Sequence, residues 1–118
     1  METLYMTENH LKILAQEGML GSHTHSHMAL GLLAPESIDE ELSKTKKYLE
    51  QLTKSSIMSV SYPFGNDFAC AEPVPELAKK NGYSIGFTMQ RGINRGDENK
   101  LLLKRLDCND LPGGKNYK

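Results

Sequence analysis

Apolar and polar residues follow the period of an α-helix most clearly between positions 38 and 52. Apolar residues recur there at spacings of four, seven and three, which places them on one helical face: Ile38, Leu42, Leu49 and Leu52. Charged residues fall mainly outside this stripe. The preceding segment Ser37-Ile-Asp-Glu40 matches the S-x-x-E capping box, so the pattern predicts that the helix starts there.

Two further helices and four strands are predicted from the residues that border them. Thr7 is a suitable N-cap for a helix that stops at Gly18, and Pro73 and Pro75 introduce a helix that Gly82 closes. Strands are expected at 19–22, 57–62, 83–88 and 101–106. Alternating helices and strands favour an α/β fold with a parallel sheet, either open or an arc of a βα barrel. A complete eight-unit barrel needs about 250 residues, so this chain would form roughly half of one.

Composition and charge place the chain among small single domains. Its 118 residues are 38% hydrophobic and 25% charged, which fits one domain over residues 1–118. A net charge of -1 gives no general reason to expect a nucleic acid or an anionic membrane as partner. No apolar run approaches the roughly 20 residues of a membrane span, and residues 1–9 lack the layout of a secretion signal. The sequence therefore leaves the compartment open.

The two cysteines exclude some functions without fixing their own state. Cys70 and Cys108 lie far apart and form no CxxC pair, which argues against a zinc ribbon or a thioredoxin-like redox site. One disulfide and two free thiols both remain open, because disulfide formation depends on the compartment.

Three of the four histidines lie in the segment Gly21-Ser-His-Thr-His-Ser-His27, directly after the first predicted strand. In α/β folds, functional groups gather at the carboxyl ends of strands. His23 and His27 would face one zinc ion if the segment turns by one helical pitch, whereas His25 would point elsewhere. Thr24 or Ser26 would supply the hydrogen bond that orients a ligand ring. A solvated histidine-rich loop and the remnant of an expression tag are the alternatives.

Further segments follow the histidines in a characteristic order. Ser61-Tyr-Pro-Phe-Gly65, Ala78-Lys-Lys-Asn-Gly-Tyr83 and Leu103-Lys-Arg105 come after a helix that contains Glu41-Leu42, Lys46 and Leu49-Glu50. Together with the histidine segment, which is similar to an H-[ST]-x-x-H motif, they resemble the NodB-homology polysaccharide deacetylases. The resemblance covers nearly the whole chain from about Gly21 onward.

This resemblance implies a distorted βα barrel, of which the chain would be a truncated domain with about four parallel strands and about three helices. It implies removal of acetyl groups from a polysaccharide with a divalent metal, usually Zn2+. By position, His23 and His27 would be the metal ligands. Tyr62, Pro63 and Phe64 would form the groove wall, with the backbone N–H of Phe64 as oxyanion donor. Many members carry Arg at the position of Ser61, whereas the aromatic-proline-aromatic segment that follows it here resembles a branch that acts on exported amino-sugar polymers. Family members are often extracytoplasmic or associated with the cell surface.

Two motifs of the family have no counterpart here, one made of acidic residues and one containing a late histidine. The family begins with paired aspartates, whereas every aspartate in this chain is unpaired and follows the histidine motif: Asp39, Asp67, Asp97, Asp107 and Asp110. No histidine follows His27. Catalytic zinc sites normally have three protein ligands, so two imidazoles alone predict impaired activity and leave it open whether the chain is an enzyme.

Three explanations of this incompleteness stay open. The chain is the C-terminal portion of a longer deacetylase, or a partner or second copy covers its sheet edge, or it is a non-catalytic module that holds metal or sugar. An exposed sheet edge and an uncovered apolar face promote association, so we expect a homo-oligomer.

The leading hypothesis is metal-dependent deacetylation of an N-acetylated polysaccharide, impaired in this chain. The alternative is a non-catalytic metal-binding or carbohydrate-binding remnant of the same scaffold. A third class, a small α/β regulatory domain with a histidine-rich loop, predicts that His23, His27 and the Tyr62 loop do not converge.

Overall fold

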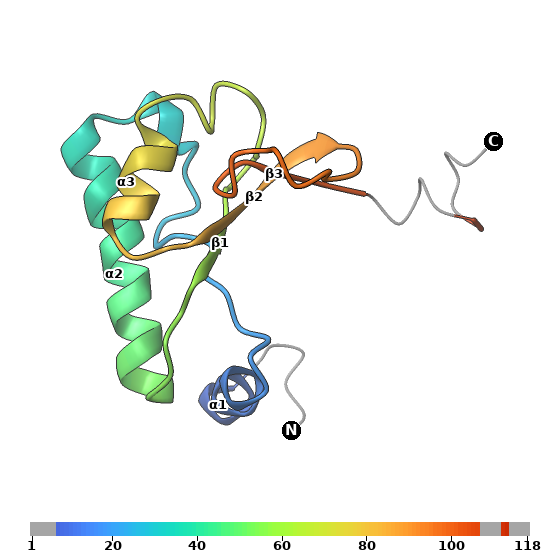
Figure 1. The fold of residues 1–118 in the computed structure, drawn as a ribbon. Helices are drawn as coiled ribbons and strands as arrows, with labels where there is room; N and C mark the ends of the chain where they lie inside the picture. Colours follow the sequence, from blue (N-terminus) through green and yellow to red (C-terminus); the bar gives the residue numbers. More distant parts are fainter. Residues whose placement is uncertain (1–6, 107–111, 114–118) are drawn as a thin grey trace.

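The computed structural model describes residues 7–106 and 112–113, and Figure 1 shows their fold. Its elements, in chain order, are α1 (Glu8–Gln16), the 3-10 turn η1 (Leu30–Leu32), α2 (Pro35–Thr53), β1 (Ser59–Ser61), α3 (Val74–Lys80), β2 (Ile85–Arg91) and β3 (Leu103–Arg105). The strands form one open parallel sheet in the order β1-β2-β3. The prediction of an α/β fold with three α-helices and a parallel sheet is therefore confirmed.

The prediction of a first strand at 19–22 is wrong. Segment 19–22 pairs with β1 only through an isolated parallel bridge between Ser22 and Val60. The Ser22 N–H donates to the Ser59 carbonyl, and the Ser61 N–H donates to the Ser22 carbonyl, both at 2.9 Å. The N–H of Met19 still bonds back to the end of α1, so the chain comes alongside β1 only at Ser22.

The helix starts differ in how well local sequence signals predicted them. Thr7 caps α1 as expected, because its hydroxyl accepts from the His10 N–H at 3.2 Å. By contrast, α2 does not start at the Ser37 capping box. It starts at Pro35, after an N-cap residue, Ala34, that makes no side-chain cap bond. Proline at the first helical position has a fixed φ that suits the helix and lacks the N–H that would go unpaired, so it sets the start without a cap.

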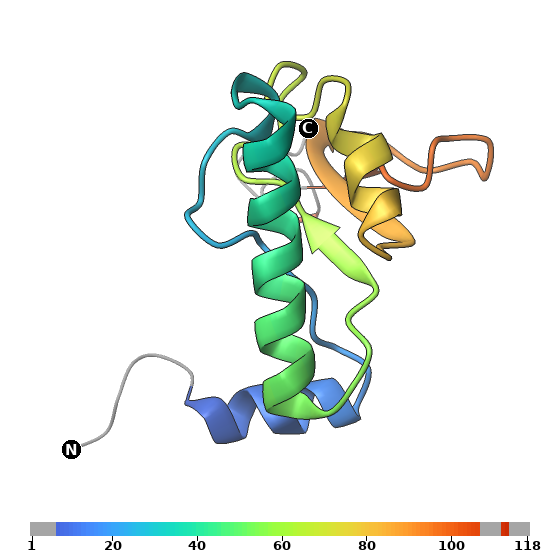
Figure 2. The ribbon, with the colours of Figure 1, turned by 90° about the vertical axis from the view of Figure 1, so that its left-hand side faces the viewer.

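Helices α2 and α3 cover one face of the sheet, and α1 lies across the C-terminal end of α2 (Figures 1 and 2). The core lies between these two layers and is built around fully buried apolar residues: Ile38, Leu42, Val60, Val74 and Ala78. The predicted apolar face of α2 is thus confirmed. On the opposite face of the sheet, Ile85 and Met89 of β2 are exposed.

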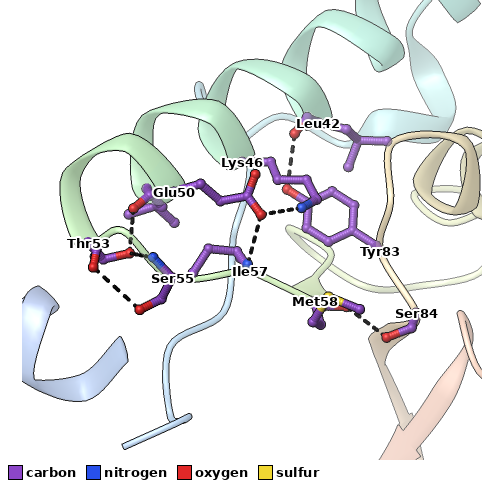
Figure 3. A network of polar contacts seen from close by, with 10 residues as sticks. Leu42, Lys46, Glu50, Thr53, Ser55, Ile57, Met58, Tyr83 and Ser84 are labelled. Carbon is purple, nitrogen blue, oxygen red and sulfur yellow. Dashed lines mark hydrogen bonds and ion pairs between the residues drawn. The ribbon is translucent and has the colours of Figure 1, made fainter. Parts of the chain in front are cut away.

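A polar network joins the end of α2 to the start of β1, as Figure 3 shows. The Glu50 carboxylate accepts from the Lys46 ammonium at 2.5 Å and from the Ile57 N–H at 3.0 Å. The hydroxyl of Tyr83 donates to the Leu42 carbonyl at 3.0 Å. These bonds fix how the chain leaves α2, and β1 then runs toward the segment that contains Tyr62, Pro63 and Phe64.

Candidate metal and substrate site

His23 and His27 lie side by side at the end of the sheet where the Ser22 bridge and β1 both finish. Their ring centroids are 4.9 Å apart with an interplanar angle of 67°. The ring of Phe64, from the segment after β1, is 5.3 Å from the ring of His27. The histidine segment and the aromatic-proline segment therefore converge, contrary to what an unrelated regulatory domain predicts.

The ring of His23 is oriented by the backbone of β1. Its Nδ1 lies 2.5 Å from the Ser61 carbonyl oxygen, which can only accept, so Nδ1 is the donor, and the neutral form of the ring has its lone pair on Nε2. A carbonyl that fixes the tautomer in this way is a common support for a metal-binding histidine.

Thr24 does not provide the orienting hydrogen bond that the sequence predicted. Within the described part of the chain, its Oγ1 is buried and has no hydrogen-bond partner. Its backbone N–H contacts the Ser22 hydroxyl at 3.4 Å. The bond comes instead from Ser61, which is 38 positions away from His23 and which no local pattern identifies.

The other members of the histidine loop have different surroundings. His25 lines a pocket against α2, together with Lys44 and Tyr48, and is not part of the ring contacts that join His23, His27 and Phe64. Ser26 contacts Glu41 of α2, with its N–H 2.9 Å from Oε1 and its hydroxyl 3.2 Å from Oε2. Sequence reasoning missed Glu41 as a contact of this loop.

The aromatic-proline segment contributes less exposed surface than predicted. Tyr62 is 0% exposed, and its hydroxyl donates to the Leu101 carbonyl at 2.7 Å, so it belongs to the core and not to a groove wall. Burial raises the pKa of this phenol, which therefore stays a hydrogen-bond donor at neutral pH. Pro63 is also buried. Of the three residues predicted to line a groove, only Phe64 presents its side chain, which is 58% exposed.

The backbone at Phe64 takes a left-handed conformation, with φ of 66°, and Gly65 follows with φ of 60°. Gly65 cannot carry a side chain here, because a Cβ would come within 2.6 Å of the Met89 backbone nitrogen. The Gly65 carbonyl accepts from the Met89 N–H at 2.9 Å. The N–H of Phe64 makes no hydrogen bond to any described residue, so it is available to an external acceptor.

The described residues supply only part of a catalytic metal site. Two adjacent imidazoles with one ring nitrogen already committed to Ser61 suit a divalent cation such as zinc. Among residues 7–106 and 112–113, however, no group of three or more His, Cys, Asp or Glu side chains could hold a metal ion. Asp67 contacts the Gln90 side chain at 2.5 Å, and Asp107 and Asp110 lie outside the described residues.

Cys70 is free and buried, on the segment between β1 and α3. Burial raises the pKa of its thiol to about 11, with a smaller contribution from the charge of Asp67, so the thiol is protonated at neutral pH. Cys108, the other member of the predicted cysteine pair, lies outside the described residues.

Comparison with known proteins assigns the family. The sequence profile of the polysaccharide deacetylases matches residues 3–86, and the chain therefore belongs to the polysaccharide deacetylase family. Among curated proteins, none matches the chain.

Solved structures of deacetylases share this fold over most of the chain. The deacetylase PplD of Streptococcus pyogenes, in complex with acetate, is similar with a TM-score of 0.77 and 25% identity, over 86% of this chain and 44% of that one. BC0361, a polysaccharide deacetylase from Bacillus cereus, gives 0.70 and 26%, over 86% and 32%. The BpsB deacetylase domain of Bordetella bronchiseptica, at 0.72 and 22% over 86% and 48%, supports the fold alone. The chain thus spans less than half the length of each, as a partial barrel would.

Within the described residues, no helix is long and apolar enough to cross a membrane.

Proposed function

We propose that the chain is part of a metal-dependent deacetylase that acts on N-acetylated polysaccharides and that it supplies two metal ligands, His23 and His27. The observation that carries this proposal is the 4.9 Å approach of the two rings, with Nδ1 of His23 bound to the Ser61 carbonyl. Membership of the family supports the reaction class. A bound zinc ion would polarise an acetyl carbonyl and lower the pKa of its bound water to roughly 7.

Phe64 is the residue through which this chain would contact the acetylated sugar. Its exposed ring stands next to His27, and its N–H has no acceptor among the described residues, so the N–H is suited to donate to the oxyanion of a tetrahedral intermediate. Tyr62 and Pro63 act beneath it, as the buried support that holds this backbone in place.

We further propose that the chain by itself has impaired activity. Two imidazoles fall one ligand short of the usual three, and the described residues add no carboxylate to them. The same shortfall favours the alternative, a non-catalytic metal-binding or carbohydrate-binding remnant of the scaffold.

Self-association is proposed to occur at the sheet edge next to Ser22. The other edge is closed at Lys104 of β3, whose carbonyl accepts from the Asn94 side-chain amide at 2.9 Å and whose N–H donates to the same side chain at 3.0 Å. A side chain that pairs with strand backbone in this way leaves no free groups there for another chain.

Zinc titration by calorimetry tests the ligand assignment. His23→Ala and His27→Ala are each expected to weaken zinc binding by at least tenfold. Loss of a residue that only supports a ligand already weakens metal binding by about tenfold or more, so loss of a ligand should cost no less. His25→Ala is the matched control, because this ring lies in the same loop but lines a pocket against α2. Equal zinc binding by wild type and His23→Ala, or equal losses in all three variants, would show that the assignment is wrong.

Acetate release from N-acetylglucosamine oligomers tests the proposed impairment. The isolated chain is expected to release no acetate above the uncatalysed background, with or without zinc. Sustained zinc-dependent turnover would refute the impairment and also the non-catalytic alternative.

A further inference from the structure

The geometry points to Glu41 of α2 as the positioning residue that holds the histidine loop, residues 23–27, in the shape that brings the rings of His23 and His27 together. Only the metal-binding role of the rings rests on the proposed function. The claim about the loop's shape stands on contacts within this chain.

The histidine loop adopts a conformation that its own residues do not favour. Thr24 and His27 both have left-handed backbone conformations, with φ of 66° and 54°, which side chains with a Cβ rarely adopt. The loop contains no helix or strand. Such a shape persists only where surrounding structure holds it, so contacts from outside the loop must fix it.

Among the described residues, hydrogen bonds from residues distant in the sequence reach the loop at two places, while the Phe64 ring packs beside His27. At its start, His23 is held by the Ser61 carbonyl. At its far end, Ser26 is held by Glu41, through both the N–H and the hydroxyl. Ser26 immediately precedes His27, so this second anchor decides where the backbone of His27 begins and how its ring approaches that of His23.

Glu41 is well placed to act as a rigid anchor. It is 8% exposed and lies on α2 between residues that fix the helix in the core, Ile38 and Leu42. Hydrogen bonds to a carboxylate are stronger than those between neutral groups, and using both oxygens also fixes direction.

Among the described residues, no salt bridge involves this carboxylate. Among the described residues the neighbouring lysines of α2 are paired elsewhere, Lys44 with Glu40 at 2.7 Å and Lys46 with Glu50 at 2.5 Å. A nearly buried carboxylate is costly unless its hydrogen bonds are satisfied, and an apolar residue would fill the space more cheaply. The hydrogen bonds to the loop therefore explain why position 41 holds a glutamate.

The decisive experiment compares Glu41→Ala with Glu40→Ala in the metal-free protein. Glu40 is the matched control, because it precedes Glu41 on the same helix and pairs with Lys44 at the surface. Two readouts report on the loop by NMR: hydrogen exchange of the Ser26 amide and the nuclear Overhauser contact between the rings of His23 and His27. Glu41→Ala is expected to speed exchange by about tenfold or more, as the loss of a charge-assisted bond implies, and to abolish the ring contact. Glu40→Ala is expected to change neither.

Two further variants guard against general unfolding. Glu41→Gln keeps an oxygen that can accept from the Ser26 N–H, so it should retain most of the ring contact. Ser26→Ala removes only the hydroxyl bond and should leave the ring contact weakened but present. If Glu41→Ala folds and leaves both readouts as in wild type, or if Glu40→Ala perturbs them equally, the inference is overturned.

Zinc affinity separates this inference from the proposed function. If the rings bind zinc, Glu41→Ala should weaken binding by about 10-fold to 100-fold, as loss of an outer supporting residue does, while Glu40→Ala should not. If the wild-type protein binds no zinc, the ligand proposal is refuted. If Glu41→Ala nevertheless loses the ring contact, Glu41 is still supported as the loop's anchor.

Discussion

The buried hydroxyl of Tyr62 offers a direct test of how the aromatic-proline segment is held. The side chain is 0% exposed, and its hydroxyl donates to the Leu101 carbonyl at 2.7 Å. Within the described residues no other hydrogen bond reaches this carbonyl, and Leu101 is itself buried. Tyr62→Phe keeps the ring in the core but leaves a buried acceptor without a donor.

The expected loss follows from the asymmetry of buried hydrogen bonds. Removing one partner of a neutral buried bond costs about 1–3 kcal/mol, because the other partner stays desolvated. For a domain of this size, each kcal/mol lowers Tm by roughly 4 °C. Urea denaturation at neutral pH should therefore show a lower midpoint with an unchanged slope, since the surface exposed on unfolding stays the same.

Tyr48→Phe is the matched control. Tyr48 lies on α2 and is 55% exposed, and its hydroxyl makes no hydrogen bond to the described residues. Tyr48→Phe should therefore change the free energy of unfolding by no more than about 0.5 kcal/mol. If Tyr62→Phe is no more destabilising than Tyr48→Phe, the reasoning fails, because the Leu101 carbonyl would then be satisfied in another way.

Two other substitutions test contacts that border the sheet, one just before β1 and one at the edge formed by β3. The Lys46 ammonium and the Ile57 N–H hold the pKa of Glu50 below its ordinary value of 4.5, so the stabilisation is present above that value and is lost as the pH falls through the lower folded-state pKa. Glu50→Gln should lower the free energy of unfolding by about 1 kcal/mol at pH 7, after allowance for partial exposure, and by much less at a pH below the folded-state pKa. An equal loss by urea denaturation at neutral and at acid pH would contradict this. Asn94→Ala should free the backbone of Lys104 in β3 and increase self-association in sedimentation experiments, whereas an unchanged mass distribution would mean that Asn94 does not protect this edge.

Helix positions were predictable to the extent that they depend on neighbouring residues. The apolar spacing in 38–52 identified the buried face of α2, and Thr7 identified the start of α1. The start of α2 was missed because two local signals competed, and Pro35 prevailed over the capping box at Ser37. The strand expected at 19–22 was missed because pairing depends on a partner strand, which the chain approaches only at Ser22.

The sequence by itself determined which residue types meet in the candidate site, since the histidine loop and the segment around Phe64 each follow a stretch that pairs in the parallel sheet. Only the tertiary structure decided how they are supported. Ser61 orients His23 across 38 positions, Glu41 holds Ser26 across 15, and Tyr62 reaches Leu101 across 39. Such contacts depend on where the folded chain returns in space, and local periodicity and capping carry no information about that.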